Sequence, residues 1–272
     1  TVPITGNSIV EISETYFVNL SGISNALVTY DSQATGTITD DDVATVSIAS
    51  VTEDEGDSGT TTYTFTVTMS AASDAVVTVD YASVNGTATT ADLDYSATSG
   101  TLTFAAGNTS QTFTVSVNGD TRIEDDETFT VDLSNLVTTS RPITLGTSSG
   151  TGTITNDDAA TISINDVTLA EGNTGTTSFT FTVSLSDASA STITVDYATS
   201  NGTATVADGD YIATAGTVVF SPGQVSKSII VPVNGDVKVE TDETFTVSLS
   251  NLFTSGLDVT VADGSGTGTI TN

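Results

Sequence analysis

Tyr63-Thr64-Phe65-Thr66-Val67-Thr68-Met69 decides the fold of this chain, because aromatic and aliphatic side chains alternate with hydroxyl side chains along it. A period of two residues puts one set on the buried face of a β-strand and the other set on the solvent face. The same alternation returns in Phe179-Thr180-Phe181-Thr182-Val183-Ser184-Leu185. These stretches predict two equivalent half-buried strands.

The chain around these strands follows the same pattern. No stretch predicts a helix longer than one turn, and Asn85-Gly86 and Pro222-Gly223 are turn signals. Strands at this spacing predict an all-β protein made of tandem immunoglobulin-like antiparallel β-sandwiches, with about seven strands each. Further alternating runs in the first copy lie at residues 76–82, 101–104, 111–117, 128–134 and 151–155.

An internal repeat sets the domain organisation. Residues 44–156 align with residues 160–272 without a gap. The alignment predicts two near-complete modules, at residues 43–158 and 159–272. The joints between modules are only a few residues long, so we expect the modules to be arranged end to end.

Residues 1–42 match only the closing part of a module. Glu11–Ser21 pairs with Glu124–Ser134, and Gly36–Asp42 pairs with Gly152–Asp158, with a connecting loop that differs by three residues. Two or three strands can hardly bury a core of their own. We therefore expect either a piece of a longer tandem array or strands that complete a sheet of another chain.

Composition excludes several classes of function. Thirty-four Asp and Glu against four Lys and Arg give a net charge of −30, which argues against nucleic acid and leaves cations as partners. The chain has no Cys, so it has no disulfide framework and no thiolate zinc site. No apolar run reaches the ~18 residues of a membrane span, and no signal peptide opens the chain. We expect no membrane insertion, and we interpret Thr1 as a mature or truncated start.

Catalysis is not expected. The chain has no His and no Cys, and its only lysines are Lys227 and Lys238. The carboxylates recur once per module, as a structural metal site does and a single active site does not. We therefore expect a protein that is not an enzyme.

A dense run of carboxylates extends from Asp120 to Glu127. Two unit charges about 4 Å apart repel by roughly 4 kcal/mol at an effective dielectric near 20. Calcium, which accepts six to eight oxygen ligands in flexible geometry, is the simplest way to offset that repulsion. The alternative is a solvated charge run that keeps a Thr-rich β-protein from pairing edge to edge.

Each module offers acidic or amide oxygens in four separate places. In the first complete module these are Glu55, Asp94, the Asp120–Glu127 run and the exit segment Asn156-Asp157-Asp158. Loops at alternate strand junctions of an antiparallel sandwich gather at one end. We therefore expect the four places to converge at one pole of the module.

Five ordered motifs carry a family resemblance over nearly all of residues 44–272. They are Glu55-Gly56, the stretch from Asn85-Gly86-Thr87-Ala88-Thr89 to Asp94-Tyr95, Gly100-Thr101-Leu102-Thr103-Phe104, Asp120-x-x-x-Glu124-x-x-Glu127-x-Phe129, and Thr153-Ile154-Thr155-Asn156-Asp157-Asp158. With these motifs the chain resembles tandem Calx-beta modules, the sandwich repeat of sodium/calcium exchangers and of bacterial-type extracellular surface arrays.

The resemblance implies calcium ligands from the loops at one pole. Gly119 and Gly235 stand where calcium sensors have a further Asp, so we expect fewer ions per module. The second module stops at Asn272, before the pair equivalent to Asp157 and Asp158, so we expect an incomplete second site. The implied ligands are Glu55, Asp94, Asp120, Glu124, Glu127, Asn156, Asp157 and Asp158 in the first complete module, Glu171, Asp210, Asp236, Glu240 and Glu243 in the second, and Asp41 and Asp42 in the leading fragment.

These observations favour a calcium-binding structural or adhesive protein, extracellular or on the cell surface. Asp157 and Asp158 lie in the linker, so calcium at the module poles would rigidify a tandem rod. One alternative is a calcium-sensing regulatory module, as in the exchangers. Another is a subunit of an extracellular fibre, in which residues 1–42 donate strands to another copy. The expected partners are calcium ions, copies of the same chain, or a cell-surface or matrix ligand.

Overall fold

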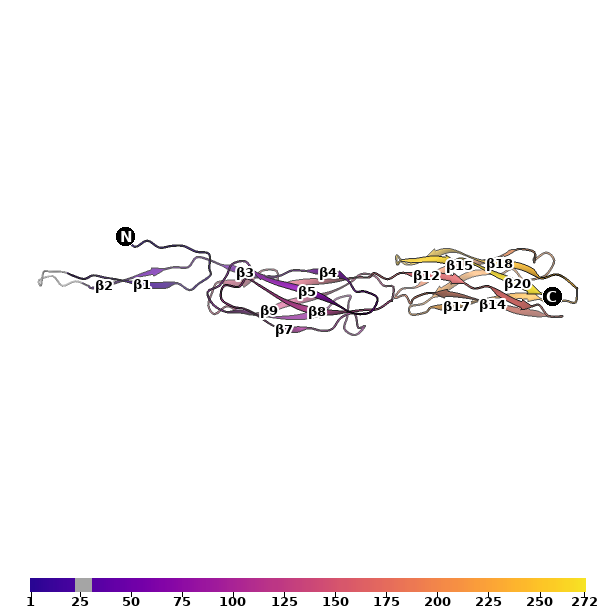
Figure 1. Cartoon of the computed structure of the whole chain (residues 1–272), viewed down its shortest axis with the longest axis horizontal. Coiled ribbons are helices and arrows are strands. Elements are labelled where there is room, and N and C mark those ends of the chain that lie inside the picture. The colour runs from indigo at the N-terminus through magenta and orange to yellow at the C-terminus, as the bar shows by residue number, and fades with distance from the viewer. Residues whose placement is uncertain (23–30) are drawn as a thin grey trace. The chain divides into compact units, whose positions relative to one another are not determined.

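The computed structural model describes residues 1–22 and 31–272, which form strands and loops (Figure 1). These residues divide into two compact units. Unit 1 comprises Thr1–Glu53, Thr60–Asn118 and Glu127–Ile154, and unit 2 comprises Asp54–Gly59, Gly119–Asp126 and Thr155–Asn272. Two acidic segments of the first complete repeat, 54–59 and 119–126, therefore belong to the unit built around the second repeat.

The first complete repeat is a sandwich of two sheets. Its strands are β3 (Ala44–Ile48), β4 (Val51–Asp54), β5 (Gly59–Met69), β6 (Val77–Asn85), β7 (Ser99–Phe104), β8 (Ser110–Gly119), β9 (Glu127–Val137), β10 (Ile143–Leu145) and β11 (Ser149–Thr155). One sheet has the order β10-β3-β5-β8, and the other has the order β4-β11-β9-β6-β7. This confirms the predicted all-β sandwich.

The second repeat has the same design. Its strands are β12 (Ala160–Ile164), β13 (Val167–Ala170), β14 (Thr176–Leu185), β15 (Ile193–Asn201), β16 (Ala215–Phe220), β17 (Ser226–Asn234), β18 (Glu243–Phe253), β19 (Val259–Asp263) and β20 (Ser265–Thr271). The sheet orders are β17-β14-β12-β19 and β13-β20-β18-β15-β16. Equivalent strands thus take equivalent places in the two repeats.

The first and last strands of each sandwich change sheets. In the first complete repeat, β3 and β4 lie in different sheets although only Ala49 and Ser50 separate them. β10 and β11 likewise lie in different sheets, and β10 pairs with β3 in parallel. The predicted seven strands therefore appear as nine segments, because two of the strands each supply both sheets.

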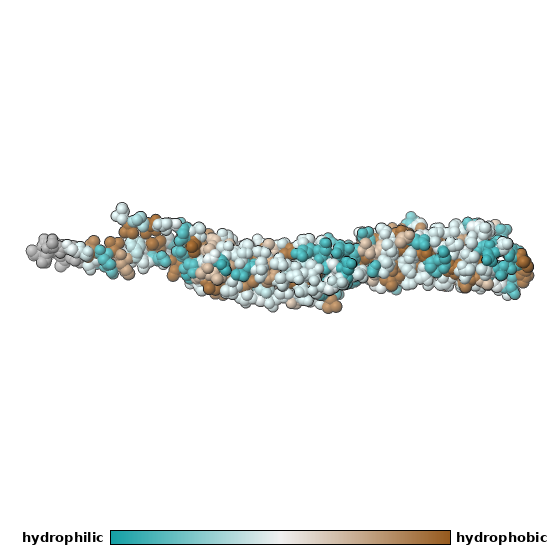
Figure 2. All heavy atoms as spheres, in the orientation of Figure 1, coloured by the Kyte–Doolittle hydropathy of each residue, from teal (hydrophilic) through white to brown (hydrophobic). Residues whose placement is uncertain are grey.

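The alternating stretch has the predicted orientation. Tyr63, Phe65 and Val67 are fully buried, whereas Thr64 and Thr68 are exposed. Each large apolar side chain moved from water into such a core contributes about 1.5–3 kcal/mol before entropy is counted. Most of the face seen in Figure 2 has intermediate hydropathy, with scattered hydrophilic and hydrophobic patches.

The leading fragment is a hairpin of β1 (Glu14–Asn19) and β2 (Gln33–Ile38), which pair antiparallel. The part of its predicted loop at residues 23–30 lies outside the described residues. Phe17 and Leu20 are more than half exposed on this hairpin. Within the described residues, no helix is long and apolar enough to span a bilayer.

Candidate metal centre

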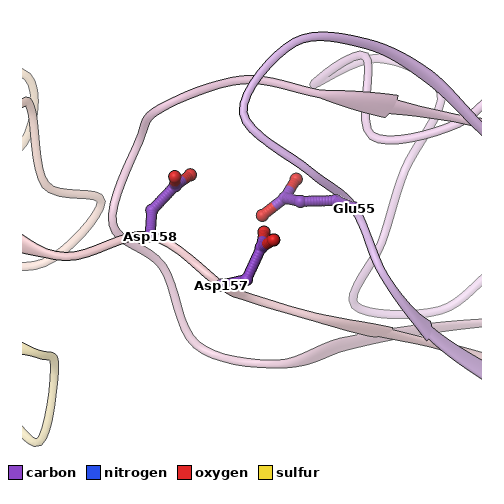
Figure 3. Close-up of side chains that lie close together, drawn as sticks. All are labelled: Glu55, Asp157 and Asp158. Carbon is purple, nitrogen blue, oxygen red and sulfur yellow. The ribbon is translucent and has the colours of Figure 1, made fainter.

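Three carboxylates of unit 2 meet where the loop after β4 lies beside the segment after β11. One oxygen each of Glu55, Asp157 and Asp158 lies within 4.8 Å of the other two. The three carboxylates gather in one place, with Asp157 pointing toward Glu55 (Figure 3). The N–H of Glu55 donates to the carbonyl oxygen of Thr155 at 3.2 Å, and the N–H of Gly56 donates to Oδ1 of Asp157 at 3.1 Å. Backbone contacts therefore position this group.

The electrostatics of this group favour a bound cation. Burial, reinforced by the charges of Asp120 and Glu124, raises the pKa of Glu55 to about 8. Burial and the neighbouring Asp157 also raise the pKa of Asp158. Among the described residues, Oδ2 of Asp158 is buried and has no hydrogen-bond partner. An unpaired buried oxygen is costly, and a cation would supply the missing partner.

The donor set fits calcium. Carboxylate and carbonyl oxygens are the ligands of this hard cation, which tolerates irregular geometry. The set contains only oxygen donors and carries several negative charges. The residues present therefore fit the ion that the family resemblance implies.

Glycine is required where calcium sensors carry a further Asp. A Cβ at Gly119 would collide with the carbonyl oxygen of Gly56, and a Cβ at Gly235 would collide with that of Gly172. The close approach of two backbone segments thus excludes a carboxylate at both positions. The smaller number of ions per module stays a prediction.

A further acidic group lies in the first complete repeat. Within unit 1, one carboxylate oxygen of Asp94 lies within 4.8 Å of one carboxylate oxygen of Glu127. Oδ2 of Asp94 accepts the N–H of Thr89 at 2.6 Å. The next residue, Tyr95, stacks on Phe129 with ring centroids 4.4 Å apart. A buried aromatic pair therefore places the loop that presents Asp94.

Asn156 orders the backbone around the acidic residues. Its Oδ1 accepts the N–H of Glu124 at 3.3 Å, and its Nδ2 donates to the carbonyl oxygen of Asp158 at 3.0 Å. Its own N–H donates to Oδ1 of Asp126 at 3.1 Å. Its side-chain oxygen has a second lone pair, so the role of Asn156 as a metal ligand stays a prediction.

The second repeat has its own group and a built-in cation. One oxygen each of Glu171, Asp236 and Glu240 lies within 4.8 Å of the others. The Nζ atom of Lys238 lies 3.4 Å from Oδ2 of Asp236 and 3.6 Å from Oε1 of Glu240. Burial, followed by the charge of Asp236, raises the pKa of Glu171. A metal ion bound here would therefore have to compete with the ammonium group of Lys238.

The remaining predicted residues belong to none of the acidic groups described above. In the second repeat, burial and the neighbouring Asp210 raise the pKa of Glu243. In the leading fragment, Asp41 and Asp42 line a cavity together with Glu11 and Glu14. No close group of three carboxylates within residues 1–22 and 31–272 includes Asp41 or Asp42.

We expect the substitution Lys238→Met to increase the calcium affinity of the second repeat severalfold, because it removes the competing ammonium. Lys227→Met removes the same charge from β17, outside the acidic group, and serves as the control. Calorimetric calcium titration of both variants measures the effect. Equal affinities in the two variants would show that Lys238 does not compete with the metal.

We expect the calcium-free protein to lose stability as the pH rises from about 5 to about 8. The pKa of Glu55 is raised from its ordinary value of 4.5 to about 8. In this window the unfolded chain has released the proton and the folded chain still holds it, so the free energy of unfolding falls. Asp158, Glu171 and Glu243 have raised pKa values and the same sign.

Thermal unfolding of the calcium-free protein at several pH values measures this dependence. Glu55→Gln removes the main titrating group and should flatten the profile. The carboxyl groups of Asp80 and Asp196 have lowered pKa values, so they affect the free energy of unfolding only below about pH 4. They do not contribute to the change between pH 5 and pH 8. A free energy of unfolding that rises toward pH 8 would contradict the raised pKa of Glu55.

Sequence reasoning missed the buried apolar residue of the acidic run. Ile123, between Arg122 and Glu124, is fully buried and belongs to the core of unit 2. A signal was present, since Val10 and Val239 occupy the same place in the other two copies of the run. An apolar residue that recurs at one position of a charged run indicates that this position packs against another part of the chain.

Comparison with known proteins gives one curated relative and several solved structures. Sodium/calcium exchanger 1 of Mus musculus is 48% identical over 61 residues, which is 22% of this chain and 6% of that protein. The crystal structure of CBD12 from CALX1.2 is 21% identical, with a TM-score of 0.39, over 83% of this chain and 99% of that one. The apo form of the Calx CBD1 domain is 24% identical, with a TM-score of 0.37, over 42% of this chain and 97% of that one.

The family comparison covers far more of the chain than the curated relative does. The Calx-beta domain matches twice, at residues 40–166 and at residues 155–271. The two matches span most of the 272 residues, and each includes all the strands of one complete sandwich. The chain therefore belongs to the Calx-beta domain family and contains two of its domains in tandem.

Proposed function

We propose that the first complete repeat binds calcium through Glu55, Asp157 and Asp158, and that the ion stiffens a tandem Calx-beta protein. The single observation that carries this proposal is the buried, unpaired Oδ2 of Asp158 within 4.8 Å of two other carboxylates. Asp120 and Glu124 raise the pKa of Glu55 and would add negative charge around the ion.

Stiffening follows from the elements that supply the ligands. Asp157 and Asp158 lie in the segment that leads from β11 to β12, and Glu55 lies in the loop after β4. A bound ion would hold these two segments together and limit the conformations of the chain between the repeats. Without the ion, the repulsion among the carboxylates favours looser arrangements.

We place this protein outside the cell or on its surface, as a structural or adhesive component without catalytic activity. The high acidity and the Thr-rich strands support a surface array. Calcium modules of the extracellular space bind at about 0.1–1 mM, which a site with few ligands can reach. The partner would then be a cell-surface or matrix ligand, or another copy of the chain.

Small-angle X-ray scattering with and without millimolar calcium tests the stiffening. We expect calcium to narrow the distribution of interatomic distances and to lower the apparent flexibility. The double variant Asp157→Asn, Asp158→Asn should remove this response, and magnesium should not replace calcium. Identical scattering curves with and without calcium would refute the stiffening.

A regulatory module is the second candidate. The support is the similarity to a protein named sodium/calcium exchanger 1, which this chain matches over only 6% of that protein's length. A regulatory module predicts micromolar calcium affinity and a conformational change in that range. Calcium titration separates the two functions, because stiffening of a surface protein predicts millimolar affinity.

A fibre subunit is the third candidate. The support is the β1–β2 hairpin, whose Phe17 is 59% exposed and whose Leu20 is 54% exposed. Such strands could complete a sheet of another copy by β-augmentation. Polymerisation that rises with protein concentration, and that Phe17→Ser reduces, would favour this function.

A further inference from the structure

An apolar residue stands immediately before the first Glu in all three copies of the acidic run. These residues are Val10, Ile123 and Val239. Val10 and Ile123 are fully buried, whereas Val239 is 96% exposed and its neighbour Val237 is 80% exposed. Figure 2 shows hydrophobic residues exposed at the C-terminal end of the second repeat. The residue at this position is therefore buried in two copies of the run and exposed in the third.

In unit 1, Val10 docks on the turn after β5, residues 72–74, which we call a docking turn. The N–H of Val10 donates to the carbonyl oxygen of Ala72 at 2.8 Å. The N–H of Asp74 donates to the carbonyl oxygen of Val10 at 3.2 Å. Ser73, at the centre of the turn, is 1% exposed. The N–H and the carbonyl oxygen of Val10 thus both form hydrogen bonds with the docking turn, and its side chain belongs to the core of unit 1.

In unit 2, Ile123 docks in the same way on the docking turn at residues 188–190, after β14. Its N–H donates to the carbonyl oxygen of Ala188 at 2.9 Å, and its carbonyl oxygen accepts the N–H of Ala190 at 2.9 Å. Ser189 is 2% exposed. Two independent copies of one contact show that the docking turn is built to receive this residue.

The loop of Val239 shares one hydrogen bond with the docked loop of Ile123. The N–H of Lys238 donates to Oδ1 of Asp236 at 2.7 Å, as the N–H of Arg122 donates to Oδ1 of Asp120 at 2.6 Å. Among the described residues, neither backbone group of Val239 forms a hydrogen bond like those of Ile123. The loop thus presents an apolar side chain and two unpaired backbone groups to solvent.

We propose that Val239 is a docking residue for a further Calx-beta repeat, whose docking turn receives it as residues 188–190 receive Ile123. A second copy of this chain is a poor occupant, because its docking turns already hold Val10 and Ile123. A repeat joined directly after the second one offers a free docking turn. The contact needs no calcium and goes beyond the proposed function.

The test extends the chain after Asn272 with a copy of residues 157–272, so that the joint has the same length as the joint after Asn156. The chain has no Cys, so Val239→Cys gives a single thiol whose alkylation rate reports exposure. We expect Cys at position 239 to react at least tenfold more slowly in the extended chain. In Ile123→Cys, used as the control, the thiol should react slowly in both chains.

Hydrogen exchange checks the contact without a substitution. The amide of Val239 should exchange at least tenfold more slowly in the extended chain, because it gains a carbonyl acceptor. A second extension, with a copy of residues 41–156, repeats the test with the docking turn of the first repeat. Equal rates at position 239 in the original and both extended chains would overturn the proposal. Protection that depends on protein concentration in the original chain would assign Val239 to self-association and would also overturn it.

Discussion

Ile123→Ala is expected to destabilise unit 2 by about 2–5 kcal/mol, the usual cost of truncating a fully buried Ile. Ile123 is 0% exposed and packs in the core that contains Phe181 and Val231. Truncation removes these contacts and leaves a cavity, although the backbone hydrogen bonds to Ala188 and Ala190 can remain. The effect is large for a residue in an exposed acidic run.

Val239→Ala is the matched control, because it occupies the equivalent place in the second repeat and is 96% exposed. Its effect should stay within about 0.5 kcal/mol. Two compact units need not unfold together, so native-state hydrogen exchange of β14 amides is the suitable measurement. Equal effects of the two substitutions would contradict the docking of Ile123.

Saturating calcium is expected to stabilise the protein by about 2.7 kcal/mol at a hundred times the dissociation constant. For a repeat of this size, that stabilisation raises the unfolding midpoint by several degrees or more. The physical reason is that calcium binds the folded group at Glu55, Asp157 and Asp158, and the unfolded chain cannot hold these carboxylates together. Thermal unfolding with calcium, magnesium or chelator measures the shift.

Glu55→Gln gives this prediction a distinctive signature. In chelator at pH 8 the variant should be at least as stable as the parent, because it removes a carboxyl whose ionisation burial and neighbouring charges oppose. In calcium it should lose most of the stabilisation. Asp132→Asn removes one charge from β9, where Asp132 accepts a hydrogen bond from Ser149, and should respond to calcium like the parent. If Glu55→Gln kept the full rise of the unfolding midpoint in calcium, that result would contradict the site.

The fold could be predicted because its signal is local. The alternation in Tyr63–Met69 reports which side chains are buried, and the structure buries Tyr63, Phe65 and Val67. The change of sheet between β3 and β4 could not be predicted in the same way. Alternation reports a face of a strand and does not report which of two sheets the strand joins.

The gathering of acidic residues was also within reach of the sequence. Glu55 and Asp158 come from segments about a hundred residues apart, and the topology of an antiparallel sandwich brings such loops together. The roles of Lys238 and Ile123 were not predicted, because both depend on side-chain contacts. A lysine in an acidic run can point to solvent or to its neighbours, and only the structure distinguishes the two.

The most direct test of the calcium site is a calorimetric titration of the metal-stripped protein with calcium, with magnesium in parallel. The double variant Asp157→Asn, Asp158→Asn is compared with the parent and with Asp132→Asn. We expect the parent and Asp132→Asn to bind calcium in preference to magnesium, and the double variant to lose at least one calcium ion per chain. The same number of calcium ions and the same affinities in all three proteins would contradict the site at Glu55, Asp157 and Asp158.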